Sequence, residues 1–306
     1  MAIERHNTDR GSLDLMWVNR VENAINTLKT IMLPKIKEGA KLALGGFSYH
    51  CFRGYLDAEF IGRDVNVSYT LLYYSNLFGF ISYKIDYNTP FDALIKMRSR
   101  SRPDETFQGS LRMTKLLGHH LLDYITSSIL LRDNEAKSFY ASIESRTSIP
   151  DNHIYQAHYQ DLEQLLIFLC GKDDNKIITH IKKIQSSDYL GFLAVQPYAT
   201  YFEVPYIQQI LMPFASVLLT IFEGKKEVFN EALEEAILQH RAYYEGSDAE
   251  EDGGSRRGNA EGWVSLLLTC VCIIAHERGF ERTIFSDYLS EWLIKGDFEG
   301  LELVVE

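Results

Sequence analysis

Proline and glycine are scarce in this sequence, with 7 prolines and 20 glycines among 306 residues. Because both residues interrupt or weaken helices, their scarcity leaves long stretches free to be helical. Cysteine is rarer still, and the four cysteines show neither a zinc-ligand nor a CxxC spacing; they are Cys51, Cys170, Cys270 and Cys272. We therefore expect buried free thiols rather than a disulfide framework or a zinc site.

Long apolar runs are also missing. A membrane-spanning helix needs roughly 20 apolar residues, whereas residues 264–275 are too few and residues 204–222 are interrupted by Gln208, Gln209 and Pro213. We expect both stretches to form buried core helices. The first residues lack the charged and apolar regions of a secretory signal. These absences predict a cytoplasmic protein without membrane insertion.

The familiar catalytic motifs are absent. His276-Glu277 would open a zinc-protease motif, but Phe280 stands where the second histidine is needed. Residues 46–50 approach a nucleophile elbow, but His50 replaces its closing glycine. No glycine-rich nucleotide-binding motif occurs. We therefore expect no catalytic centre and no cofactor.

Histidines occur in pairs that could suggest a metal site. His119, His120 and Asp123 lie within one helical turn, and a metal-dependent hydrolase that uses them is one alternative function. No second helix offers matching ligands, which argues against a metal. His153 and His158 are five residues apart, the wrong spacing for one helix face, so we expect surface or capped histidines.

Apolar residues recur at spacings of three and four through every long segment, the period of an amphipathic helix. We expect an all-α fold, an irregular multi-helix bundle or a solenoid-like stack of helical hairpins, with Thr283–Phe285 as the best strand candidate. The tyrosine-rich and phenylalanine-rich stretches at residues 69–83 and 198–206 fit either core or interface. The expected helices cover residues 12–37, 42–61, 64–86, 107–131, 134–144, 152–170, 175–185, 206–222, 226–244 and 263–278.

Two segments suggest how the chain is divided. Residues 96–103 read KMRSRSRP, a basic break, so the chain is either a single helical domain, 1–306, or two helical subdomains, 1–100 and 107–306, joined by a basic loop. Residues 246–259 read GSDAEEDGGSRRGN. This composition predicts a mobile acidic, glycine-rich loop.

The net charge of −11 is concentrated in the C-terminal half, where residues 224–252 carry nine acids against three bases. Acids at helical spacing place like charges on one face, at a cost of a few tenths of a kcal/mol per pair. One hypothesis is that this face attracts a basic partner, with the two adjacent tyrosines as aromatic anchors; the other is a solvated acidic face above buried tyrosines. The candidate partner-binding residues are Glu227, Glu231, Glu234, Glu235, Tyr243, Tyr244, Asp248, Glu250, Glu251 and Asp252.

The stretch from Glu231 to Ile294 resembles a known family signature. It reads EALEEAILQHRAYYEG and then GWVSLLLTCVCIIAHERGFERTIFSDYLSEWLI, and it is similar to the immunity-49 family of bacterial polymorphic-toxin immunity proteins. Ser290 stands where the family usually has a proline. The matching elements are His240 with Tyr243-Tyr244, Glu261-Gly262-Trp263, Ala275 with Arg278-Gly279, and Ser286-Asp287-Tyr288-Leu289.

The resemblance implies a binding protein without enzymatic activity. Such a protein would bind and neutralise a cognate antibacterial toxin, for instance a nuclease, made by the same cell. The acidic half fits a basic toxin and disfavours nucleic acid as a direct ligand. The alternative is a helical scaffold or adaptor that binds a peptide or protein partner. The oligomeric state stays open.

Overall fold

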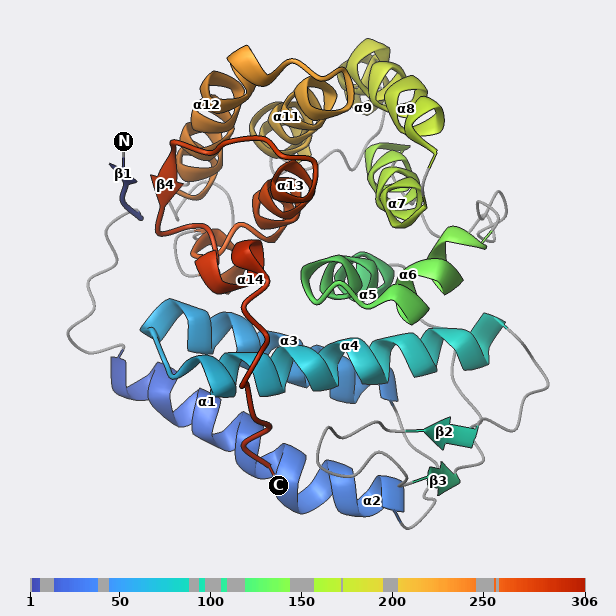
Figure 1. Cartoon of the computed structure of the whole chain (residues 1–306), viewed down its shortest axis with the longest axis vertical. Helices are drawn as coiled ribbons and strands as arrows, with labels where there is room; N and C mark the ends of the chain where they lie inside the picture. Colours follow the sequence, from blue (N-terminus) through green and yellow to red (C-terminus); the bar gives the residue numbers. More distant parts are fainter. Residues whose placement is uncertain are drawn as a thin grey trace. The chain divides into compact units, whose positions relative to one another are not determined.

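The computed structural model describes eleven segments of the chain (Figure 1), residues 2–5, 14–37, 44–87, 94–96, 106–108, 119–143, 157–171, 173–194, 203–245, 256 and 259–305. Helices make up most of these residues, which confirms the predicted all-α fold. The strands found in the described segments form two sheets of two strands each. β1 (Ala2–Ile3) runs parallel to β4 (Phe285–Ser286), and β2 (Leu94–Lys96) runs antiparallel to β3 (Thr106–Gln108).

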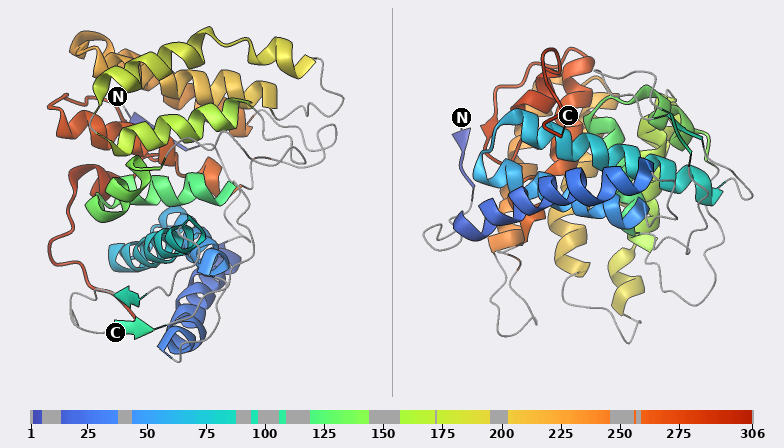
Figure 2. Two further views of the ribbon diagram at one scale, coloured as in Figure 1. Left: turned by 90° about the vertical axis from the view of Figure 1, so that its right-hand side faces the viewer. Right: turned by 90° about the horizontal axis from the view of Figure 1, so that it is seen from below.

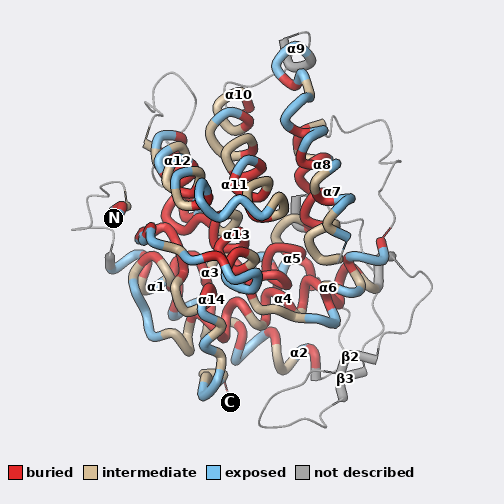
Figure 3. Tube along the Cα trace, turned by 45° about the horizontal axis from the view of Figure 1, so that its top comes forward, coloured by how far each residue is buried: buried red, intermediate tan, exposed pale blue. Residues whose placement is uncertain are grey.

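The chain forms two compact units. Unit 1 contains residues 1–8 and 132–297, and unit 2 contains residues 9–131 and 298–306. Each unit has its own buried core (Figure 3). The basic segment at which we predicted a subdomain boundary lies largely outside the described residues, and so does most of the predicted loop 246–259.

Unit 2 is built around the hairpin of α3 and α4, against which α1 and α5 pack. Gly62, with a φ of +66°, makes the turn between α3 and α4 that other residues rarely adopt. Most aromatic residues of α4, including Tyr74, Phe78 and Tyr83, are buried, so this stripe belongs to the core. The helices of unit 2 are α1 (Asp14–Thr27), η1 (Leu28–Met32), α2 (Leu33–Lys37), α3 (Leu44–Ile61), α4 (Val65–Tyr87) and α5 (His119–Leu130).

A buried ion pair crosses the core of unit 2. Asp57 on α3 is 1% exposed, and its Oδ2 lies 3.0 Å from Nε of Arg20 on α1. Burial raises the pKa of Asp57 to about 6, although Arg20 and Arg53 oppose the shift. The guanidinium of Arg20 also lies 4.3 Å from the centre of the Trp17 ring. Arg20 therefore both neutralises a buried carboxylate and covers an aromatic core residue.

Residues 298–305 return to unit 2 and lie along α4. The backbone N–H of Glu302 donates to Oδ1 of Asn66 over 2.9 Å, and that of Val304 donates to Oγ1 of Thr70 over 3.0 Å. The ring of Phe298 lies 6.3 Å from that of Tyr69. Residues 298–305 are thus held by side chains that lie one helical turn apart on α4.

Unit 1 is an irregular stack of helices, as the two further views in Figure 2 show. α6 packs on α7, α7 on α8, and α8 on α11, which also contacts α12 and α13. α11 is therefore the central helix of the stack. The helices are α6 (Asn134–Ala141), α7 (Ala157–Cys170), α8 (Asp174–Ser186), α9 (Tyr189–Ala194), α10 (Glu203–Tyr206), η2 (Ile207–Leu211), α11 (Met212–Phe222), α12 (Lys226–Glu245), η4 (Ala260–Gly262), α13 (Leu266–Glu277) and α14 (Glu291–Lys295).

Two segments of unit 1, Glu203–Phe222 and Ala260–Glu277, are long and apolar enough to cross a membrane by length and composition alone. The tested window is 44% buried in the first segment and 67% buried in the second. α11 and α13, which lie in these segments, pack against each other. In this structure both segments serve as packing elements of unit 1.

The spacing of apolar residues predicted the helices well, but it did not reveal two places where the helix locally widens. η1 and η2 are five-residue π-helical segments, and each ends two residues before a proline, Pro34 and Pro213. A proline has no N–H and its ring crowds the carbonyl four residues earlier, which lies inside the widened turn in both cases. A third difference corrects the helix that we predicted from Phe107. Its first residues form the strand β3 instead of a helix.

Candidate functional site

α12 is a 20-residue helix with one buried and one exposed side. It starts just after Gly224, whose φ of +73° allows the chain to leave α11 and turn back. The buried side chains recur at spacings of three and four and face α11 and α13, which fixes α12 in the stack. They are Phe229, Leu233, Ala236, Ile237, His240, Tyr243 and Tyr244.

The exposed side of α12 carries the predicted acids. Glu227, Glu231 and Glu235 are exposed, and Glu234 is partly exposed. Glu235 accepts a hydrogen bond of 2.6 Å from Nε2 of Gln239. In the part of the chain that the structure describes, no lysine, arginine or histidine nitrogen lies within 4.0 Å of these four carboxylates. Among the described residues, these four carboxylates therefore have no ion-pair partner.

The basic residues nearest in sequence are engaged elsewhere. Nζ of Lys226 donates to the carbonyl oxygen of Gly279 over 2.8 Å, and Arg241 pairs with Glu245 over 3.0 Å. Lys225 pairs with Glu223 over 2.8 Å. The hydrogen bond with Glu223 is the main cause of the raised pKa of Lys225, and the charge of Glu227 is the smallest contribution. Among the described residues, the acids of α12 thus face solvent without an ion-pair partner.

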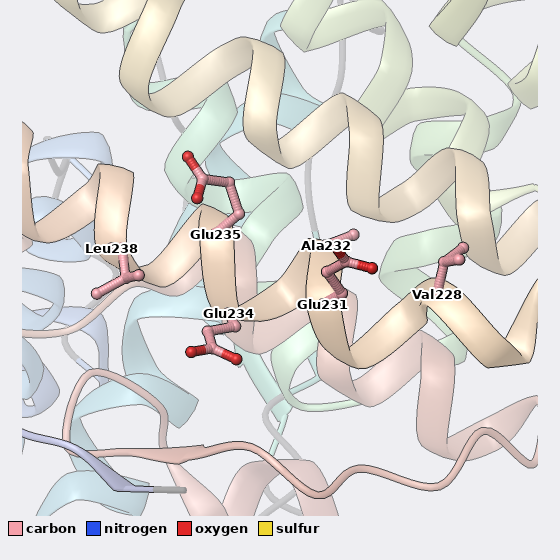
Figure 4. A pocket seen from close by; sticks show the side chains of 6 residues that line it. All are labelled: Val228, Glu231, Ala232, Glu234, Glu235 and Leu238. Atoms are coloured by element: carbon pink, nitrogen blue, oxygen red, sulfur yellow. The ribbon is translucent and has the colours of Figure 1, made fainter.

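Six side chains of α12 line one open hollow on the outer side of the helix, with a volume of about 540 Å³ (Figure 4), and we call them the α12 face: Val228, Glu231, Ala232, Glu234, Glu235 and Leu238. Val228 and Leu238 are 37% and 41% exposed. They are ten residues apart, which corresponds to about 15 Å along a helix axis. Glu231 and Glu235 fall between them on the same stripe, because the steps are three, four and three residues. The face is therefore a row of two acids flanked by two apolar residues.

The other predicted partner-binding residues lie elsewhere. Tyr243 and Tyr244 are each 7% exposed and belong to the buried side of α12. Neither ring has the exposure that an aromatic anchor needs. Asp248, Glu250, Glu251 and Asp252 lie outside the described residues.

The residues of the family-like signature converge in the interior of unit 1. His240 on α12 places Nε2 3.3 Å from the carbonyl oxygen of Gly262, and its ring lies 5.1 Å from that of Tyr288. The carbonyl oxygen of Tyr288 accepts from the N–H of Ser265 over 2.8 Å. Trp263 is almost fully buried. This half of the signature therefore joins α12, η4, α13 and the segment after β4.

The rest of the signature also fixes architecture. Arg278 makes two bonds, of 2.9 and 2.6 Å, to the carboxylate of Asp174 at the start of α8, and its guanidinium lies 4.1 Å from the centre of the Phe222 ring. Gly279, with a φ of +71°, ends α13. Oγ of Ser286 donates to the carbonyl oxygen of Ile3 over 2.8 Å, which secures β1. The signature thus marks the fold of unit 1 rather than an exposed surface.

A buried polar cluster on α7 and its neighbours was not predicted. The carboxylate of Asp161 accepts from the hydroxyl of Tyr189 and from Nζ of Lys183, both over 2.6 Å. Nε2 of His180 lies 2.9 Å from the backbone oxygen of Asp161. Every charged or polar end in this cluster has a partner within unit 1, so the cluster accounts for stability and needs no ligand.

His158 was expected at the surface or in a cap, and the structure corrects this. The side chain is 1% exposed and its ring packs 4.3 Å from that of Tyr159. Burial lowers its pKa to about 4, although the nearby Asp161 raises it. His158 therefore stays uncharged at neutral pH.

The neutral state of His158 predicts a loss of stability in acid. The unfolded chain binds a proton at the ordinary pKa of about 6.5, whereas the folded protein resists protonation down to about pH 4. The contribution of His158 to stability is therefore complete above about pH 6.5 and falls as the pH drops, by about 2 kcal/mol between about pH 7.5 and pH 5. Urea unfolding at the two pH values measures this loss. The His158→Leu variant should show a shallower pH dependence, and an equal slope in both proteins would contradict the assignment.

Among the described residues, no group of three or more histidine, cysteine, aspartate or glutamate side chains could hold a metal ion. His119 and His120 lie at the start of α5 and Asp123 lies on the same helix. Cys51, Cys270 and Cys272 are buried free thiols, as predicted, and Cys170 is only partly buried. Burial raises the pKa of Cys272 to about 12, which makes its thiol a poor nucleophile.

Comparison with known proteins adds one finding. Residues 89–293 match the model of a family described as Immunity protein 49, and this range is two thirds of the chain. The match includes all of α12 and the signature residues up to α14. Neither a curated protein nor a solved structure matches the chain.

Proposed function

The chain belongs to the immunity protein 49 family, and we propose that it protects the cell that makes it by binding and neutralising a cognate antibacterial toxin. The observation that carries the proposal is the family match over residues 89–293. The match reaches far beyond the signature from which the sequence indicated the family. It extends from before α5 to α14 and therefore includes nearly all the helices of unit 1.

The structure supports neutralisation by binding rather than by chemistry. The signature histidine, His240, lies in the interior between aromatic rings, where a substrate could not reach it. The family residues instead hold a stack of helices that presents rigid outer faces. Rigid faces favour tight binding because little freedom is lost on association. Inhibition then consists of occupying or covering the active site of the toxin.

The charge of the protein indicates the kind of toxin. With a net charge of −11 and an acidic outer side on α12, the protein attracts basic partners and repels nucleic acid. Toxin nucleases are often basic because they must approach phosphates. A basic toxin, with a nuclease as the leading example, is the partner that we propose.

Co-expression tests this proposal. We expect that bacteria producing the toxin domain encoded beside this chain survive only when the chain is co-produced, and that the two proteins co-purify. A matched control is the chain with Trp263→Asp, which places a charge in the core of unit 1 and should abolish rescue. Killing that continues at equal levels with the intact chain would refute the proposal and leave the adaptor function as the alternative.

A further inference from the structure

The outer side of α12 combines carboxylates that have no ion-pair partner among the described residues with exposed apolar groups. Resting on the function proposed above, we propose that the α12 face is the surface that docks the toxin, and that the toxin meets it with a basic surface carrying apolar side chains beside its lysines or arginines. The claim concerns the six residues around the hollow in Figure 4.

The first support is the unbalanced charge. Glu227, Glu231, Glu234 and Glu235 follow one another at spacings of four, three and one, so their carboxylates repel each other along one side of the helix. No cation of the described segments lies within ion-pair distance of these four carboxylates. Cations brought by a partner would relieve the repulsion and would also accelerate the encounter. The charge complementarity therefore selects a basic occupant.

The second support is the position of the apolar groups. Val228 and Leu238 flank the acids at a separation of about 15 Å along the axis, and the small side chain of Ala232 leaves room between them. Single exposed apolar residues are common on protein surfaces. Two exposed apolar residues that lie on either side of a row of acids, next to one hollow, resemble the mixture of apolar and charged groups at protein interfaces. Val228 and Leu238 provide apolar surface area that a docked partner would bury, which charged groups alone do not provide.

The third support is the rigidity of the helix. Its N-terminal half is tied to the segment after α13, because Asn230 donates to the carbonyl oxygen of Glu281 over 2.9 Å and accepts from the N–H of Thr283 over 2.8 Å. Its C-terminal half is fixed by His240 and the buried tyrosines. The face is therefore preorganised, and a partner would not have to order it on binding.

Other occupants fit less well. A second copy of the chain would set acids against acids if the α12 faces met, and like charges in contact oppose association. Nucleic acid is repelled by the same charges. A basic protein surface is the occupant to which the charge and the apolar groups both point.

The decisive experiment reverses the charge of the face and of a matched surface. The test variant is E231K/E234K/E235K, and the control is D297K/E299K/E302K, which changes the net charge equally at exposed acids in the last described segment. Association with the toxin domain encoded beside this chain is measured by stopped flow at low and high salt. We expect the test variant to associate about tenfold more slowly or worse at low salt, with weaker salt dependence, and the control to stay within about twofold of wild type.

A second pair of variants covers the case in which the triple lysine variant folds poorly. E231Q/E234Q/E235Q removes the charge without adding repulsion and should also slow association, and L238S should raise the dissociation rate while the melting temperature stays unchanged, because Leu238 is exposed. Wild-type rates for the glutamine and serine variants would overturn the docking proposal while the toxin-binding function stands. Absence of binding by wild type itself would instead overturn the proposed function. Loss of self-association in these variants, with toxin binding unchanged, would assign the face to a second copy and also overturn the proposal.

Discussion

Gly262→Ala should lower the free energy of unfolding by about 3 kcal/mol, since a methyl group has no space at this position. A Cβ on Gly262 would lie 2.5 Å from Cδ1 and 2.6 Å from Cγ of Tyr244. The ring of Tyr244 is itself enclosed, with the rings of His240 and Tyr243 each 4.9 Å away. The collision therefore cannot be relieved by a small movement. Chemical unfolding in urea, monitored by circular dichroism, measures the loss.

A double-mutant cycle isolates the cause of that loss. In a Tyr244→Ala background the ring is gone, so adding Gly262→Ala should cost less than about 1 kcal/mol more. An equal cost of Gly262→Ala in both backgrounds would show that the methyl group clashes with something other than Tyr244. Loss of toxin binding in a Gly262→Ala protein of normal stability would assign the signature to the contact surface and contradict its structural role.

Arg20→Ala should destabilise the protein by about 2 kcal/mol at neutral pH, because it removes the nearest counter-charge of the buried Asp57 carboxylate, and protonation of that carboxylate limits the cost. The pKa of Asp57, already raised to about 6, should rise further when Arg20 is removed. Protonation of Asp57 removes the buried charge. The cost of Arg20→Ala should therefore shrink as the pH falls from about 7.5 to about 5, which urea unfolding of variant and wild type at both pH values measures.

Arg20→Ala/Asp57→Leu provides the control for this prediction. With the carboxylate replaced by an apolar group, most of the lost stability should return, since a buried pair and a hydrophobic replacement are often similar in stability. A part of the loss should remain, because Arg20 also covers the ring of Trp17. If the double variant is as unstable as the single one, the packing of Arg20 on Trp17 matters more than the buried charge.

The fold could be predicted where local periodicity decides the structure. The helix expected at residues 226–244 is observed as Lys226–Glu245, and the one expected at residues 64–86 as Val65–Tyr87. Pairings between segments that are far apart in the sequence could not be predicted. Ile3 faces Ser286 across the parallel pair of β1 and β4, and a pattern read in windows of a few turns carries no information about a partner so far along the chain.

The candidate site was predicted in part, and the sequence held a signal that would have improved it. The spacing of Glu231 and Glu235 placed both on the exposed side of α12 correctly. Tyr243 lies three and seven residues after His240 and Ala236, on the buried stripe of the same helix. On α7, His158 precedes Leu162 and Leu165 by four and seven residues and shares their buried side. If the apolar stripe of each helix had been extended to include the polar residues at the same spacing, Tyr243 and His158 would both have been predicted as buried.

The polar cluster around Asp161 was beyond prediction for a different reason. It depends on side chains from helices that the fold brings together, Lys183 on α8 and Tyr189 on α9 beside Asp161 on α7. A sequence pattern specifies which side of each helix is buried. It does not specify which helices become neighbours.

Each unit contains a short segment that is far in sequence from the rest of the unit, and this affects how the protein folds during its synthesis. Unit 1 needs residues 2–3 to pair with residues 285–286, and unit 2 needs residues 298–305 along α4. At roughly 5 to 20 residues per second, synthesis of a chain of this length takes about 15 to 60 seconds. Unit 1 stays incomplete until residues 285–286 have been made, and unit 2 until residues 298–305 have been made. Until then their unpaired surfaces are open to chaperones and proteases. A chain that stopped just before residue 298 would contain every residue of unit 1, but its unit 2 would lack the segment along α4.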